Sequence, residues 1–134
     1  MEMWTHALSS YNRFGPVAHE AAYRHGGEWL DQLLGVIKGN FEYVRDFLGE
    51  HFPNVVVTPM EATYLMWCNF GCFGLNDNEL RDFFTDDCQL YLGAGINYGE
   101  TGSGYQRINL ACPRKILEDS MARLLSGAKK RGLI

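Results

Sequence analysis

The sequence has no CxxC pair, no excess of positive charge and no long apolar run, and each absence excludes a class of protein. Its four cysteines are scattered, which disfavours a zinc site or a disulfide scaffold and favours free thiols in a reducing cytoplasm. A net charge of −4 leaves no basic surface for nucleic acid. No segment approaches the ~20 apolar residues that cross a bilayer, and the first residues lack a signal-peptide core. We expect neither nucleic acid nor a membrane as partner.

What is present is sufficient for a packed core. The chain has 134 residues, of which 46% are hydrophobic and 13% aromatic, a composition typical of a folded globule. It contains no internal repeat, low-complexity stretch or linker. We therefore expect a single domain over residues 1–134.

Four segments carry helix signals. The clearest is an apolar stripe at three- and four-residue steps from Leu30 to Leu48, which Gly49 and Pro53 end. Asn76 followed by Glu79 is a capping-box pattern. Pro16 and Pro113 mark the starts of two other helices, because proline is favoured in the first turn of a helix. The sequence predicts helices over residues 17–23, 30–48, 76–86 and 113–125.

Four short apolar runs between these helices read as strands. The run 54–58 is expected to be buried, and the run 64–70, apolar on both faces, to be central. The other two are 89–92 and 105–110. The order is two helices, two strands, a helix, two strands and a helix. This order predicts an α/β (α+β) fold in which helices cover a four-stranded mixed or antiparallel sheet.

The glycine-rich segment 93–104 follows a predicted strand, as a phosphate-binding loop does. The GxGxxG pattern fails at its third glycine, however, and the segment leads into a strand instead of a helix. Without a helix N-terminus there is no preformed anion site. The pattern therefore indicates a flexible hairpin connection.

Arg107 is the most informative polar residue, because it lies inside an otherwise apolar strand. Three interpretations are open for it. The side chain lies on the exposed face of an edge strand, or a protein carboxylate pairs with it, or its planar guanidinium binds the carboxylate of a ligand through two parallel hydrogen bonds. The pattern alone favours the first two.

Four stretches of the chain form a recognisable set: FGPVAHEAAY at 14–23, EWLD at 28–31, EATYLMW at 61–67 and GINYGETGSGYQRINLACPR at 95–114. They resemble the cystathionine β-lyase/C–S lyase branch of the class I/II aminotransferase-like, fold-type I enzymes, which use pyridoxal phosphate (PLP). The resemblance spans nearly the whole chain and is most specific between Gly95 and Pro113. Asn69, the pair Gly93-Ala94 and Tyr98 depart from the branch's usual residues.

This resemblance implies that the chain is the small C-terminal domain of a PLP enzyme that acts on cystathionine or cysteine-like amino acids. Arg107 would bind the substrate α-carboxylate, and Gly95, Asn97 and Tyr98 would belong to a loop that approaches the active site. The parent enzyme would be a cytoplasmic homodimer. An aminotransferase domain, or an amino-acid-binding module without enzymatic activity, remains an alternative.

The resemblance also implies that the catalytic part lies elsewhere. The family's PLP lysine and most of its cofactor contacts precede this region. None of the chain's lysines stands in a cofactor-lysine context: Lys38, Lys115, Lys129 and Lys130. We expect no PLP bound to this chain by itself and no activity from it. We also expect that apolar surface around Trp4, Leu8 and Phe14 favours self-association.

Overall fold

The computed structural model describes Asn12 and residues 14–134. These residues fall into two compact units, one up to Gly35 and one from Val36 onward. The first holds helix α1 (Phe14–His25) and the start of α2 (Gly27–His51). No residue of α1 is buried, and Phe14 is 81% exposed. Trp4 and Leu8, which share the predicted apolar surface with Phe14, lie outside the described residues.

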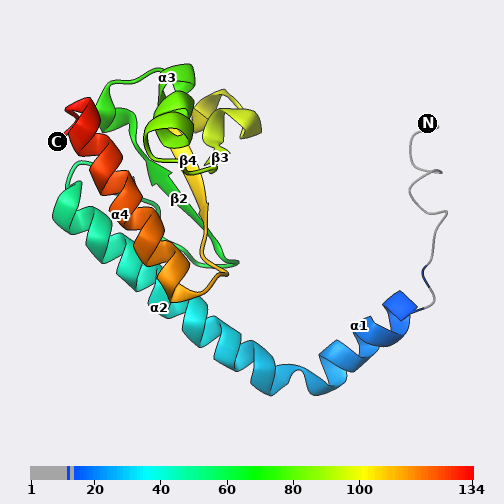
Figure 1. Ribbon diagram of the computed structural model, residues 1–134. Helices are drawn as coiled ribbons and strands as arrows, with labels where there is room; N and C mark the ends of the chain where they lie inside the picture. Colours follow the sequence, from blue (N-terminus) through cyan, green and yellow to red (C-terminus); the bar gives the residue numbers. More distant parts are fainter. Residues whose placement is uncertain (1–11, 13) are drawn as a thin grey trace, which may run out of the picture. The chain divides into compact units, whose positions relative to one another are not determined.

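The second unit is built on an antiparallel sheet (Figure 1). Within the described residues its strands are β1 (Val56–Val57), β2 (Leu65–Asn69), β3 (Gly93–Ala94) and β4 (Tyr105–Asn109), in the spatial order β1-β2-β4-β3. This order confirms the predicted class of fold and the central place of the strand at 64–70. The strand at 105–110 is central as well.

Helices cover one face of this sheet. Helix α4 (Arg114–Arg131) runs beside the part of α2 that belongs to this unit (Figure 1). Their apolar side chains and those from one face of β2 and β4 form the core, because alternate strand residues point to that face. Members of this core are Val44, Leu48, Met66, Cys68, Ile108, Leu117, Met121 and Leu124.

The short helix α3 (Asp77–Asp82) begins as the sequence predicts. Asn76 Oδ1 accepts hydrogen bonds from the backbone N–H groups of Asn78 and Glu79 at 3.0 and 3.1 Å. Glu79 Oε2 in turn accepts one from the Asn76 N–H at 2.9 Å, which completes a capping box. The helix continues as a π-helical turn, η2 (Phe83–Asp87). Leu80, Phe83 and Phe84 are buried, as expected.

Two strand predictions were wrong in detail. The predicted strand at 89–92 is displaced to Gly93–Ala94. Gln89 has a left-handed φ of 53°, its carbonyl accepts from Arg123 and the Leu90 N–H donates to the Phe84 carbonyl, so these residues bond to helical segments instead of the sheet. The predicted buried strand at 54–58 is reduced to Val56–Val57 at the edge of the sheet, and Val56 is 60% exposed. No helix in the described part of the chain is long and apolar enough to span a membrane.

A buried asparagine, Asn40 on α2, holds the connection between β4 and α4. Its Nδ2 donates to the carbonyl oxygens of Leu110 and Cys112 at 2.8 and 2.9 Å. Its Oδ1 accepts from Nε of Arg114 at 3.0 Å. Asn40 is only 1% exposed, so water does not compete for these bonds. The side chain thereby fixes the end of β4 relative to the helix layer.

Replacing Asn40 with Ala is expected to lower the free energy of unfolding by about 2–3 kcal/mol, because buried hydrogen-bonding groups lose their partner. Chemical denaturation of the chain measures this loss. Asn54→Ala is the matched control, since Asn54 is exposed and its replacement should change the midpoint little. Equal midpoints for the two variants would contradict the role given to Asn40.

Candidate functional site

Arg107 lies at the middle of the sheet, with Trp67 of β2 opposite it on one side and Gly93 of β3 on the other. Its neighbours Gln106 and Ile108 are buried toward the helices. Because side chains alternate along a strand, Arg107 points to the opposite face, where it is half-buried. The first structural interpretation, an arginine on an edge strand, is therefore wrong.

The second structural interpretation, an internal ion pair, also fails for the described residues. The ion pairs found among them involve other cations, and Arg107 has no carboxylate oxygen within 4.0 Å. Its guanidinium carbon instead lies 4.9 Å from the centre of the Tyr98 ring, a distance typical of a cation–π contact. The guanidinium of Arg107 thus lies against an aromatic ring, and no carboxylate of the described residues pairs with it.

Tyr98 is itself supported by a tryptophan. Its ring centre lies 5.3 Å from that of Trp67, with the planes at 81° in an edge-to-face arrangement. The ring of Tyr105 lies 6.4 Å from Trp67 in a similar geometry. Trp67, Tyr98 and Arg107 therefore form a continuous row across the exposed face of the sheet.

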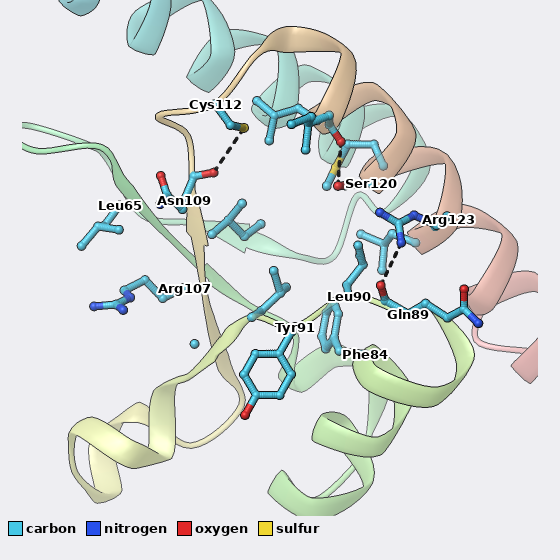
Figure 2. A pocket seen from close by; sticks show the side chains of 17 residues that line it. Leu65, Phe84, Gln89, Leu90, Tyr91, Arg107, Asn109, Cys112, Ser120 and Arg123 are labelled. Carbon is cyan, nitrogen blue, oxygen red and sulfur yellow. Dashed lines mark hydrogen bonds between the residues drawn. The ribbon is translucent and has the colours of Figure 1, made fainter.

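Two cavities reach Arg107. One, of about 330 Å³, lies between the segment 58–63 and the side chains of Leu65, Trp67 and Arg107. The other, of about 580 Å³, is lined by residues of β4, of the segment 89–93 and of helix α4. Figure 2 shows this second cavity, where Arg107 and Leu65 extend away from the helix that carries Ser120 and Arg123. The guanidinium is open to a ligand from the exposed face.

The predicted loop residues have different surroundings. Tyr98 contacts Arg107. Gly95 is buried, and its backbone is pressed against Gly102 so closely that a Cβ on either residue would overlap the other's carbonyl oxygen. Asn97 is exposed and lines a separate cavity of about 80 Å³ with Arg81 and Gln106. The structure therefore brings Tyr98 to Arg107 but leaves Asn97 apart from it.

The loop between β3 and β4 is more regular than a flexible hairpin. It forms two short 3₁₀ turns, η3 (Gly95–Tyr98) and η4 (Glu100–Gly102). Asp77 at the start of α3 accepts hydrogen bonds from Ser103 Oγ at 2.9 Å and from the Gly104 N–H at 3.0 Å. These hydrogen bonds attach the loop, on which Tyr98 lies, to the start of helix α3.

The thiols are unsuited to nucleophilic chemistry. Burial raises the pKa of the Cys68 thiol to about 12, and burial together with the charge of Asp87 raises the pKa of Cys88 to about 12. Burial also raises the pKa of Cys72 and Cys112. Since the thiolate is the nucleophile, none of the four is activated near neutral pH. Arg107 remains the best candidate for ligand binding.

Comparison with known proteins gives these observations a context. No protein-family model matches the chain. It is 36% identical over 117 residues to the cystathionine beta-lyase PatB of Bacillus subtilis, covering 87% of this chain and 30% of that protein. Cystalysin from Treponema denticola, whose crystal structure contains a pyridoxal 5′-phosphate cofactor, superposes with a TM-score of 0.88 at 30% identity, over 91% of this chain and 31% of cystalysin. The PLP-bound C–S lyase of Staphylococcus hominis gives 0.81 at 26% identity, over 92% and 33%.

The chain is homologous to PLP-dependent C–S lyases. It spans about 30% of the length of the curated relatives that it matches. The similarity agrees with the resemblance seen in the sequence, and the fold of this chain superposes on about 31% of the cystalysin chain.

The residues of this chain do not fit the covalent attachment of PLP. A lysine that forms a Schiff base lies in a site that lowers its pKa and shields it from water. Lys38 projects from α2, and Lys115, Lys129 and Lys130 from α4, and all four are exposed. Arg107, and not a lysine, is therefore the candidate residue for binding a ligand.

Proposed function

We propose that the chain is the small C-terminal domain of a PLP-dependent C–S β-lyase that acts on cystathionine or cysteine-like amino acids. In this proposal Arg107 binds the α-carboxylate of the substrate, and Tyr98 supports its guanidinium. The observation that carries the proposal is a half-buried guanidinium on a central strand, held by an aromatic ring and without a carboxylate among the described residues. The homologues supply the class of substrate.

The contribution of Arg107 is to bind and orient. A guanidinium presents two parallel N–H groups to a carboxylate, which fixes the direction of the ligand as well as its position. In a site partly shielded from water these charge-assisted bonds are stronger than at the surface. Orienting the amino acid places its other bonds at a defined angle to the catalytic groups, which lie outside this chain in the proposal.

The parent enzyme is proposed to be a cytoplasmic homodimer. The first unit supports an extensive partner surface, because its helices expose many large apolar side chains: Phe14, Val17, Tyr23, Trp29, Leu30 and Leu34. Solitary apolar residues are common on protein surfaces, but a group of this size is typical of an interface. We propose that the remaining domain and the second subunit cover these side chains. The four free thiols are in keeping with a reducing compartment.

A kinetic panel on the parent enzyme tests the proposed activity. Incubated with PLP and cystathionine, it is expected to release a thiol, pyruvate and ammonia by β-elimination faster than it transfers the amino group of the same substrate to a 2-oxo acid. Coupled assays for pyruvate, free thiol and the new amino acid measure both reactions on one preparation. Faster transamination would assign the domain to an aminotransferase. An enzyme that catalyses neither reaction would contradict the proposal.

A further inference from the structure

Gly93 occupies an unexpected position for a glycine. It lies in β3 directly opposite Arg107, and a glycine inside a strand is unfavourable because it packs no side chain. Its backbone does not require glycine, since Gly93 is absent from the residues with positive φ in the described chain. The reason for a glycine at this position must therefore lie in its surroundings.

The surroundings of Gly93 are the side chain of Arg107. A Cβ at position 93 would lie 3.1 Å from Arg107 Nε, 3.3 Å from its Cβ and 3.7 Å from the guanidinium carbon. The first two distances are shorter than ordinary van der Waals contact, so the arginine would have to shift by a few tenths of an ångström. The stem of Arg107 thus crosses the strand in the space that a side chain at 93 would occupy.

The other side of the guanidinium is bounded by Tyr98, at 4.9 Å from its ring centre. No ion pair within the described residues fixes the direction of Arg107. Its orientation therefore depends on packing, with an open space at Gly93 and an aromatic ring at Tyr98. A change at either position should redirect the guanidinium without altering its charge.

We infer that Gly93 is a positioning residue of the carboxylate site: by lacking a side chain, it lets Arg107 lie across β3 and against Tyr98. This inference rests on the proposed function for its meaning in catalysis, but the geometry it asserts is a property of the chain alone. A residue larger than glycine at 93 would leave the arginine present and charged, but its guanidinium would no longer point to the substrate carboxylate.

The test is NMR of the arginine Nε–Hε groups in the ¹⁵N-labelled chain of 134 residues. Arg107→Lys identifies the Arg107 signal by its loss. In the unchanged chain this signal should stand apart from those of exposed arginines, because the Tyr98 ring current acts on it. Gly93→Ala should move it toward the exposed group. Gly49→Ala is the matched control, since a Cβ there meets open space and the signal should stay in place.

The outcomes separate clearly. An Arg107 signal that is unmoved in folded Gly93→Ala would overturn the inference and leave the proposed function intact, since no ligand takes part. If Gly93→Ala fails to fold, the double variant Gly93→Ala/Arg107→Ala decides: removing Nε and the guanidinium should restore most of the melting temperature. A double variant as unstable as the single one would show that the Gly93→Ala substitution does not act through the part of the Arg107 side chain beyond Cβ, and would overturn the inference. The proposed function fails separately, if Arg107→Ala in the parent enzyme leaves kcat/KM unchanged.

Discussion

Arg107→Ala in the parent enzyme is expected to lower kcat/KM for amino-acid substrates by about 10²-fold or more. In the proposed function the substitution removes a bidentate, charge-assisted pair in a partly shielded site, and about 1.4 kcal/mol corresponds to each tenfold change. The variant should still bind PLP, because none of the chain's lysines fits the cofactor and its main contacts are proposed to lie outside this chain. Activity and PLP absorbance are measured on the same preparation.

Arg107→Lys is the matched variant. It keeps the charge but cannot reproduce the fork of the guanidinium, so it should recover only part of the lost activity. A purely structural arginine gives a different pattern: the Ala variant would melt at a lower temperature, and the fraction that stays folded would turn over normally. Near-normal kcat/KM in a folded, PLP-loaded Arg107→Ala enzyme would remove Arg107 from the site.

Gly95→Ala is expected to destabilise the chain by about 3 kcal/mol, the upper end of what overpacking a tight site costs. The added Cβ would overlap the carbonyl oxygen of Gly102 and lie 2.7 Å from the Cβ of Tyr105. The first of these is a backbone atom, so the clash cannot be relieved by rotating a side chain. The 3₁₀ turns would have to separate, and Tyr98 would lose its place beside Arg107. Denaturant unfolding of the 134-residue chain measures the loss.

Gly49→Ala again serves as the control for Gly95→Ala. It is the same substitution in a helix, at a position where the new Cβ has no neighbour within 4 Å. Alanine is favoured over glycine inside a helix by up to about 1 kcal/mol, so this variant should be as stable as the unchanged chain or slightly more so. If Gly95→Ala unfolded at the same denaturant concentration, the contact between Gly95 and Gly102 would not be important for the loop.

Local signals in the sequence were sufficient for most of the fold. The capping box at Asn76 and Glu79 acts between residues three positions apart, so its pattern is visible without the structure. The apolar stripe of α2 and the central strand at Tyr64 to Phe70 are equally local. The strand at 89–92 was misplaced because nothing in its composition shows that Gln89 adopts a left-handed backbone or that the backbone of Gln89 and Leu90 bonds to Arg123 and Phe84.

The site depends on long-range contacts that the sequence does not show. Arg107 could be picked out as a charge inside an apolar strand, but its contacts with Tyr98 and Gly93 arise from strand register and from the turns that follow β3. The hydrogen bonds of Asn40 join residues 70 and 72 positions apart. Asp77, which fixes the loop, is 26 positions from Ser103. The proposed role of Arg107, binding of the substrate carboxylate, came from the resemblance to C–S lyases and not from the pattern of the residues.

The most direct test of the role proposed for Arg107 is a crystal structure of the parent enzyme with PLP and a bound amino-acid ligand. We predict that two guanidinium nitrogens of Arg107 lie about 2.7–2.9 Å from the two oxygens of the ligand α-carboxylate, with the Tyr98 ring still against the guanidinium. A carboxylate held by other side chains, with Arg107 directed away from it, would contradict this role.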